Sequence, residues 1–83
     1  MKLAIVVPAY NEEKTIAKTV SGIRDFADVI VVDDCSKDQT SQQAESAGAQ
    51  VVRHETNKGY DGALHTGVLA SFKRGYTHVI TFD

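Results

Sequence analysis

The strongest constraint on the fold is a run of four apolar β-branched residues that stops abruptly at two acids. Residues 29–32 read Val-Ile-Val-Val, and Asp33 and Asp34 follow directly. An uninterrupted apolar run of this length is typical of a strand buried on both faces at the centre of a parallel sheet. In open α/β sheets, ligands bind just beyond the carboxyl ends of the strands. The two acids therefore mark a candidate ligand site.

Short apolar runs alternate with segments of helical periodicity along the rest of the chain. We expect strands at residues 3–7, 29–32, 50–54 and 77–82. Between the first two strands, Ile16, Val20 and Ile23 are spaced four and three residues apart, which predicts one apolar stripe of a helix. Asn11 is the expected N-cap of this helix, because its side-chain oxygen can accept a hydrogen bond from a free backbone amide of the first turn.

Two further helices are expected, one after each of the next two strands. The second helix should run to about Ala47, with Gly48 placed to end it. Residues 57–62 read as a glycine-containing loop, and the third helix should begin at Ala63. Strands that alternate with helices imply a parallel sheet with right-handed crossovers. We therefore predict an α/β fold, a Rossmann-like three-layer half-domain with helices on both faces of a four-stranded parallel sheet of order 3-2-1-4.

In this strand order, the carboxyl ends of the first, second and fourth strands are neighbours. They carry the segment from Pro8 to Tyr10, the acids Asp33 and Asp34, and Asp83. Clustered carboxylates repel one another unless a cation or a hydrogen-bond donor lies between them. Mg²⁺ or Mn²⁺ would suit these oxygen ligands, and a nucleobase N–H or a ribose hydroxyl would suit them as a donor.

Two other features of the sequence favour a nucleotide or a phosphate ester as the ligand. Tyr10 offers a flat apolar face for a base, and Lys58 and the loop amides around Gly59 could contact a phosphate. Gly59, Gly62 and Gly67 do not form the Gly-x-Gly-x-x-Gly fingerprint, which disfavours a nicotinamide cofactor. The residues alone therefore indicate a nucleotide or phosphate-ester site, with or without a metal ion.

Composition and charge restrict the partners and the location of the protein. The formal net charge is -2 and no cluster of Lys and Arg is present, which argues against a nucleic acid partner. Cys35 is the single cysteine, so no disulfide can form within the chain, and a reducing, cytoplasmic location is expected. The apolar run at residues 3–7 is too short to span a membrane, so we expect membrane contact only through segments missing from this sequence. His54, His65 and His78 share no metal-binding spacing and are expected to have surface or structural roles.

Four motifs follow one another along the chain. They are residues 6–13 (VVPAYNEE), 31–40 (VVDDCSKDQT), 57–59 (NKG) with Gly67, and 80–83 (ITFD). As an ordered set they are similar to the motifs of the family 2 glycosyltransferases, with the dolichyl- or polyprenyl-phosphate sugar synthases as the closest subgroup. The resemblance covers essentially the whole chain.

The resemblance implies that residues 1–83 are the N-terminal nucleotide-binding portion of a truncated GT-A domain. The donor would be a nucleoside diphosphate sugar with Mg²⁺ or Mn²⁺ on its diphosphate, and the reaction an inverting transfer to an acceptor such as a polyprenyl phosphate. By this resemblance, the predicted nucleotide-binding residues are Pro8, Ala9, Tyr10, Glu12, Val32, Asp34 and Asp83. Asp83 would also be the first acid of the Asp-x-Asp metal motif. Lys58 and Gly59 are the candidate phosphate contacts, and no catalytic residue is identified.

The sequence leaves other functions open. Because it ends at Asp83, it lacks the second acid of the motif and an acceptor site, so we expect no transferase activity from this chain alone. One alternative is a catalytically inactive nucleotide-binding module. Another is a self-associating α/β unit, since an uncovered edge strand at residues 77–82 would invite pairing with another chain. Within the acid pair, Asp34 is the expected ligand-facing acid by resemblance, and Asp33 is expected to hold the turn.

Overall fold

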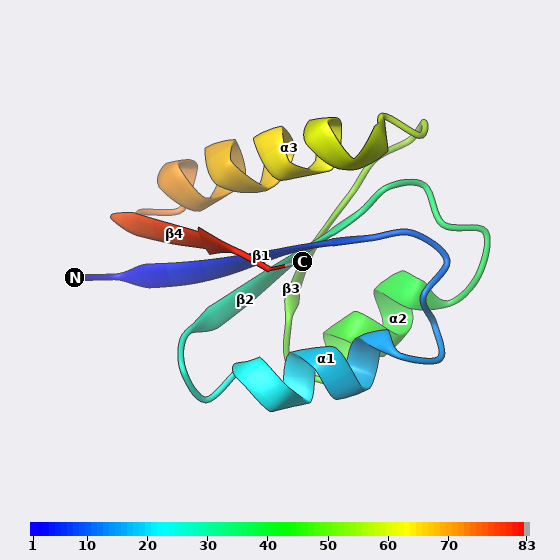
Figure 1. Cartoon of the computed structure of the whole chain (residues 1–83), viewed down its shortest axis with the longest axis horizontal. Coiled ribbons are helices and arrows are strands. Elements are labelled where there is room, and N and C mark those ends of the chain that lie inside the picture. The colour runs from blue at the N-terminus through cyan, green and yellow to red at the C-terminus, as the bar shows by residue number, and fades with distance from the viewer. Residues whose placement is uncertain (83) are drawn as a thin grey trace.

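The computed structural model describes residues 1–82, and within them strands and helices alternate from one end to the other (Figure 1). The strands are β1 (Leu3–Ala9), β2 (Asp28–Asp33), β3 (Gln50–Arg53) and β4 (His78–Thr81). The helices are α1 (Ile16–Ile23), α2 (Thr40–Ser46) and α3 (Gly59–Lys73). This order of elements agrees with the order predicted from the sequence.

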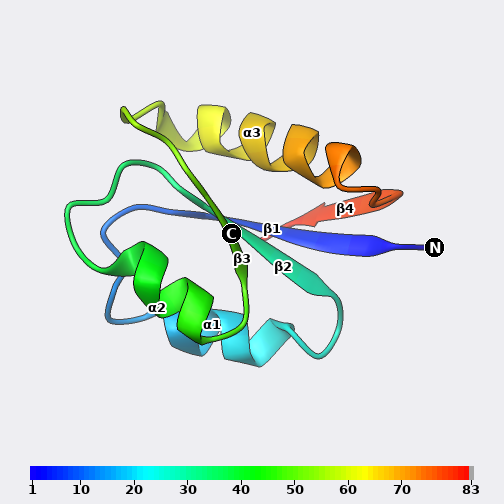
Figure 2. The same cartoon turned by 180° about the vertical axis from the view of Figure 1, so that it is seen from behind.

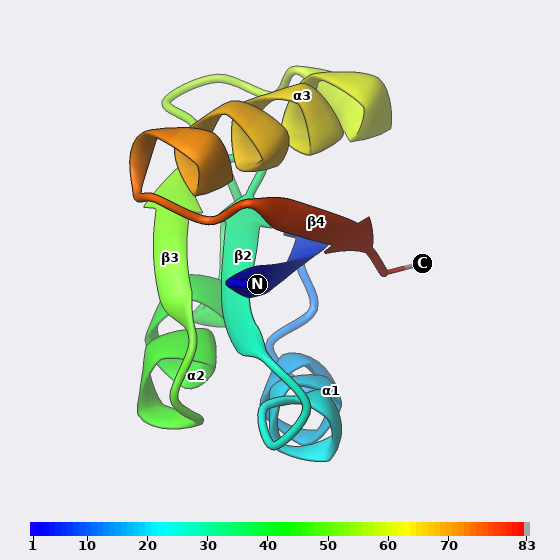
Figure 3. The same cartoon turned by 90° about the vertical axis from the view of Figure 1, so that its left-hand side faces the viewer.

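Neighbouring strands of the sheet are parallel, and their order is β3-β2-β1-β4. The two central strands pair from Ala4 opposite Asp28 to Ala9 opposite Asp33, so they end side by side. Figure 3 shows α3 on one face of the sheet, with α1 and α2 together on the other face. The predicted α/β fold class, its three layers and its strand order are therefore confirmed.

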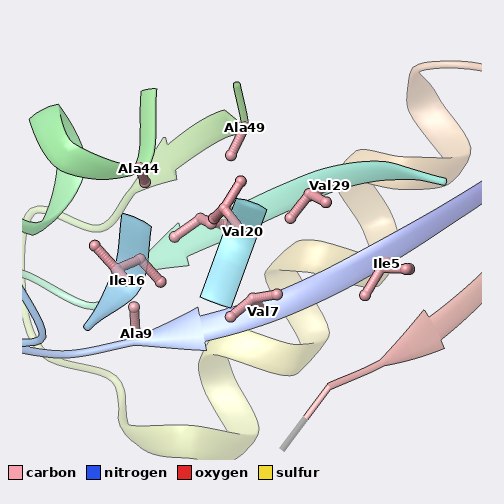
Figure 4. Close-up of a cluster of buried hydrophobic side chains, with 9 residues drawn as sticks. Ile5, Val7, Ala9, Ile16, Val20, Val29, Ala44 and Ala49 are labelled. Atoms are coloured by element: carbon pink, nitrogen blue, oxygen red, sulfur yellow. The ribbon is translucent and has the colours of Figure 1, made fainter. Parts of the chain in front are cut away.

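The largest buried cluster lies between the sheet and the helices α1 and α2 (Figure 4). Because successive strand residues point to opposite faces, Ile5 and Val7 of β1 join this cluster whereas Val6 faces α3. Ile16 and Val20 are fully buried, which confirms the apolar stripe expected for the first helix. Figure 2 shows α1 and α2 on the same side of the sheet, where the two helices pack against each other.

The opposite face of the sheet is covered by α3, whose backbone lies close against β1 and β2 at Gly67. A Cβ at this position would lie 2.3 Å from Val6 Cγ1 and 3.1 Å from Val32 Cγ2. One turn later, the buried Ser71 hydroxyl donates a hydrogen bond to the Gly67 carbonyl at 2.7 Å. The missing side chain thus allows the helix to lie directly on the two central strands. Its first turn then reaches the carboxyl end of the sheet (Figure 1).

Two of the predicted helix starts are wrong. α1 begins at Ile16, and Asn11 is not its N-cap. The Asn11 backbone instead adopts a φ of +51°, and its side chain accepts a hydrogen bond from the Lys37 amide at 2.8 Å. α3 begins at Gly59, four residues before the expected Ala63. Both segments take their shape from partners that are distant in sequence, which local patterns do not reveal.

The ends of the four strands and the end of α2 agree with the predictions to within two residues. Gly48 follows the last turn of α2 with a φ of +107°, the left-handed region that glycine adopts without steric cost. Its predicted role at the end of this helix is therefore confirmed. No helix within residues 1–82 has both the length and the apolar character needed to cross a membrane.

Candidate functional site

A pocket of about 220 Å³ opens at the carboxyl ends of β1 and β2. It is formed by the end of β1 and the loop that follows, by the residue after β2, and by the segment leading into α3. The lining residues are Pro8, Ala9, Tyr10, Glu12, Asp34, Asn57, Gly59, Tyr60 and Ala63. The pocket therefore lies at the edge of the sheet where the sequence predicts a ligand site.

The most deeply held acid of this pocket is Asp34, which is 5% exposed. Its Oδ1 accepts hydrogen bonds from His54 Nδ1 at 2.7 Å and from the Lys58 amide at 2.8 Å, and its Oδ2 accepts one from the Gly59 amide at 2.8 Å. Burial alone would raise the pKa of the Asp34 carboxyl, but these hydrogen bonds outweigh it and hold the pKa below its ordinary value. The pocket thus contains an ionised hydrogen-bond acceptor at neutral pH.

His54 connects this acid to α3. The imidazole is buried, and its second nitrogen, Nε2, lies 2.7 Å from the Thr66 hydroxyl. Because an ionised carboxylate only accepts hydrogen bonds, the proton lies on Nδ1 and is donated to Asp34. His54 is buried within the fold and is not on the surface, and sequence reasoning missed its link to the site. The strand register contains this signal. Asp33 pairs with Arg53 at the ends of β2 and β3, so the residues that follow them, Asp34 and His54, come next to each other.

Asp33 is fully buried and is not among the residues that line the pocket. Its carboxylate accepts hydrogen bonds from the Ser36 amide at 2.9 Å, from the Ser41 hydroxyl, and from Arg53 at 2.9 Å. Burial alone would raise the pKa of the Asp33 carboxyl, but the hydrogen bonds from Ser36 and Ser41 and the charge of Arg53 lower it below its ordinary value. This arrangement confirms that Asp33 holds the turn after β2.

The turn after β2 also fixes the loop after β1, which forms one wall of the pocket. The Ser36 hydroxyl accepts a hydrogen bond from the Asn11 amide, and the Thr40 hydroxyl accepts one from the Glu12 amide, both at 2.8 Å. Asp38 in turn accepts from the Thr40 amide at 3.0 Å. The polar side chains of this turn therefore position a neighbouring loop rather than a ligand.

Thr40→Val is expected to destabilise the protein by about 1–2 kcal/mol, because it leaves the Glu12 amide without its acceptor while keeping the side-chain shape. Amide hydrogen exchange at Glu12 should become faster in this variant. Thr56→Val, at an exposed loop position, is the matched control and should change neither stability nor exchange. Equal effects of the two variants in urea unfolding would contradict the proposed contact between the loops.

The structure brings most of the predicted site residues together. Those that line the pocket are Pro8, Ala9, Tyr10, Glu12, Asp34 and Gly59. Tyr10 is 46% exposed and forms part of the rim. Val32 does not line the pocket, because its side chain is fully buried in the core beneath Gly67. Lys58 does not line it either; its backbone amide binds Asp34 and its side chain is exposed.

Three residues of the lining were not predicted, and one predicted residue cannot be placed. Asn57 and Tyr60 belong to the segment that was expected to be a loop, and Ala63 is the expected first residue of the third helix. Asn57 accepts a hydrogen bond from the Gly59 amide at 3.1 Å, so it helps to form the first turn of α3. Asp83, the predicted nucleotide and metal ligand, lies outside the described residues.

The described residues do not by themselves form a metal site. Within residues 1–82, no group of three or more His, Cys, Asp or Glu side chains could hold a metal ion. Of the two acids in the pocket lining, Asp34 already accepts three hydrogen bonds. The pocket described here is therefore suited to recognising a planar group with N–H donors, since it combines an aromatic rim with a buried anionic acceptor.

Comparison with protein families identifies the family to which the chain belongs. The sequence model of the family described as glycosyl transferase family 2 matches residues 4–83, which is nearly the whole chain. The chain therefore belongs to glycosyl transferase family 2, as its motifs predict.

Curated relatives agree with this assignment. An uncharacterized protein of Methanocaldococcus jannaschii is 40% identical over 84 residues, covering 99% of this chain and 35% of that protein. The UDP-N-acetylglucosamine–dolichyl-phosphate N-acetylglucosaminyltransferase of Methanococcus voltae is 33% identical, and the match covers 95% of this chain and 39% of that protein. The undecaprenyl-phosphate mannosyltransferase of Micrococcus luteus is 32% identical, and the match covers 100% of this chain and 37% of that protein. The chain thus spans little more than a third of the length of these relatives.

Solved structures show the same fold. Glucosyl-3-phosphoglycerate synthase from Mycobacterium tuberculosis, crystallised with Mn²⁺, UDP and glucosyl-3-phosphoglycerate, superposes with a TM-score of 0.84 at 29% identity. The match covers 99% of this chain and 33% of that chain. The same enzyme has been crystallised with Mn²⁺, UDP-glucose and phosphoglyceric acid, and with Mg²⁺ and UDP, at TM-scores of 0.84 and 0.83.

Proposed function

We propose that this chain is the nucleotide-binding portion of an inverting glycosyltransferase that takes its sugar from a nucleoside diphosphate donor. The observation that carries the proposal is the pocket at the ends of β1 and β2, which is lined by both the buried acid Asp34 and the partly exposed ring of Tyr10. Membership of family 2 supports it, as do structural neighbours crystallised with UDP or UDP-glucose. Residues 1–83 would be the N-terminal part of a GT-A domain.

The nucleoside would occupy the described pocket. Tyr10 would stack on the base, and Asp34 would accept a hydrogen bond from a base N–H. Glu12 would accept hydrogen bonds from the ribose hydroxyls, and Pro8 and Ala9 would form the apolar wall. Val32 would contribute through its backbone alone, since its side chain is fully buried.

The diphosphate would leave the pocket towards the first turn of α3. Lys58 is exposed next to this turn and would contact a phosphate through its side chain, because the amides of Lys58 and Gly59 already donate to Asp34. The proposal includes Mg²⁺ or Mn²⁺ on the diphosphate, with Asp83 as its first protein ligand, because the structural neighbours were crystallised with these ions and UDP. When bound, such an ion would stabilise the charge of the departing diphosphate.

The proposed acceptor is a polyprenyl phosphate, the acceptor class in the names of two relatives. A phosphate acceptor is already anionic, so its attack needs little help from a protein base. We expect the 83-residue chain alone to bind the donor without transferring or hydrolysing it. Release of free sugar or phosphate from a nucleotide sugar by the pure chain would contradict this expectation.

Isothermal titration with UDP and with GDP, each in the presence of Mn²⁺ at millimolar nucleotide, tests the proposal. Binding of at least one nucleotide is expected. Asp34→Asn should weaken it roughly tenfold or more, because a charge-assisted hydrogen bond to the base is lost. Asp25→Asn, at an exposed position in the loop before β2, removes the same charge and should leave the affinity unchanged. Absence of heat with both nucleotides would refute the proposal.

We also propose that β4 can mediate self-association of this chain. β4 is the edge strand next to β1, and Ile80 on it is 52% exposed. An exposed strand edge with an apolar side chain favours pairing with a second strand. Sedimentation velocity should detect a dimer that Ile80→Lys weakens roughly tenfold, a change of about 1.4 kcal/mol. Leu69→Lys, on the exposed side of α3, adds the same charge as a control, and a monomer at all concentrations would contradict the proposal.

A further inference from the structure

The carboxylate of Asp34 is held by three donors that differ in kind. The amides of Lys58 and Gly59 belong to the backbone at the start of α3, so no side-chain substitution there removes them directly. His54 is the one side chain within residues 1–82 that donates to this carboxylate. Its own orientation is fixed from the other side by the Thr66 hydroxyl, 2.7 Å from Nε2.

Counting acceptor positions shows which part of the carboxylate remains for a ligand. A carboxylate offers about four lone-pair directions, two on each oxygen. Oδ1 of Asp34 uses two of them, for His54 and for the Lys58 amide. Oδ2 uses one, for the Gly59 amide, which itself borders the pocket. Counting donors from residues 1–82, one acceptor position is therefore left, and it is on Oδ2.

The direction of that position depends on the rotation of the carboxylate group. The terminal torsion of an aspartate is soft, with a broad and roughly two-fold energy profile. Hydrogen bonds to both oxygens suppress this rotation, and the one from a side chain comes from His54 at 2.7 Å. His54 is in turn held against rotation by Thr66 on α3. The contacts from Thr66 through His54 to Asp34 thus act together with the two amides in setting where Oδ2 points.

We propose that His54 is a positioning residue for base selection. Held by Thr66, it directs the unused acceptor position of Asp34 Oδ2 into the pocket. The site would then select a base that carries an N–H beside a carbonyl. Uracil at N3 and guanine at N1 carry such a group, whereas cytosine carries an acceptor at N3. The inference rests on the proposed nucleotide-binding function, and it explains how the site would distinguish one base from another.

The test compares two ligands that differ only at this N–H. The first ligand is UDP or GDP, whichever binds more tightly, and the second is its methylated counterpart, N3-methyl-UDP or N1-methyl-GDP. The affinity of the same protein for each ligand is measured by calorimetry. Wild type should prefer the unmethylated nucleotide roughly tenfold or more, the range of a hydrogen bond to a charged acceptor. His54→Leu should bring this ratio close to one by weakening only the unmethylated ligand.

Two further variants separate positioning from general damage. His54→Asn retains an N–H close to the position of Nδ1, so it should restore most of the preference. Thr66→Val removes only the hydroxyl that holds Nε2, so it should reduce the preference partly, and it carries the comparison if His54→Leu does not fold. A purely structural role of His54 would weaken both ligands equally and leave their ratio unchanged.

The outcomes distinguish the inference from the function on which it rests. A ratio that falls in His54→Leu and returns in His54→Asn supports the inference. The inference is overturned if the wild-type protein binds both ligands equally well. It is also overturned if the ratio of the two affinities is unchanged in both His54→Leu and Thr66→Val. Nucleotide binding would stand in either case. Wild type that binds neither UDP nor GDP overturns both.

Discussion

Gly67→Ala is expected to destabilise the protein by about 2–3 kcal/mol, because the added methyl group would overpack the interface between α3 and the sheet. Its Cβ would lie 2.3 Å from Val6 Cγ1 and 3.1 Å from Val32 Cγ2. Both valines are fully buried and have a stiff first side-chain torsion, so neither can move aside. Alanine is otherwise the better helix former by about 1 kcal/mol, so propensity alone predicts the opposite sign.

Gly22→Ala provides the matched control for this prediction. Gly22 lies in α1, and a Cβ there would meet no atom within 4 Å. The substitution should therefore stabilise the protein by about 0.5–1 kcal/mol. In urea unfolding, the free energy of unfolding should fall in Gly67→Ala and rise in Gly22→Ala. A neutral or stabilising Gly67→Ala would mean that α3 does not lie on the central strands as described.

Asp33→Ala is expected to lower the free energy of unfolding by about 3 kcal/mol. The substitution leaves the Ser36 amide without its acceptor in a buried turn and leaves Arg53 without its ion-pair partner. The Arg53 side chain is 47% exposed, so most of the loss is expected from the buried turn rather than from the ion pair. Asp25→Ala, at an exposed loop position, should cost far less. Equal losses in urea unfolding would show that Asp33 does not hold the turn.

The acid pair also predicts how stability depends on pH. In the folded protein, the pKa of Asp33 and the pKa of Asp34 both lie below the ordinary value of 3.8. The stabilisation from each carboxylate is therefore complete above about pH 4 and is lost as the pH falls through the folded pKa. Urea unfolding at decreasing pH should give a shallower acid dependence for Asp33→Asn than for wild type. An unchanged dependence would contradict the stated ionisation of Asp33.

The fold could be predicted because its main determinants are local. The run Val29 to Val32 is apolar without interruption since β2 is buried on both faces, between β1 and β3 at its edges and helices above and below. Ile16 and Val20 mark the buried face of α1 by their spacing alone. Once strands and helices alternate at short intervals, few topologies remain, and the right-handed crossover selects the observed one.

The site could be predicted only in part, because some of its contacts join residues far apart in the sequence. Tyr10 and Asp34 follow buried strands, so their convergence follows from the strand order. Gly59 was expected in a loop, and its place in the first turn of α3 depends on a hydrogen bond to Asp34, twenty-five residues earlier. His54 has no local signature of its role, which arises from the pairing of β2 with β3.

The most direct test of the account is a titration of the ¹⁵N-labelled protein with UDP and with GDP, each with Mg²⁺, followed by amide chemical shifts. Saturable shifts are expected for the pocket amides of Tyr10, Asp34 and Gly59. Asp28 and Tyr76, which are hydrogen-bonded to each other at the opposite end of the sheet, should not shift. Shifts at the opposite end only, or none at millimolar concentrations of either nucleotide, would contradict the account.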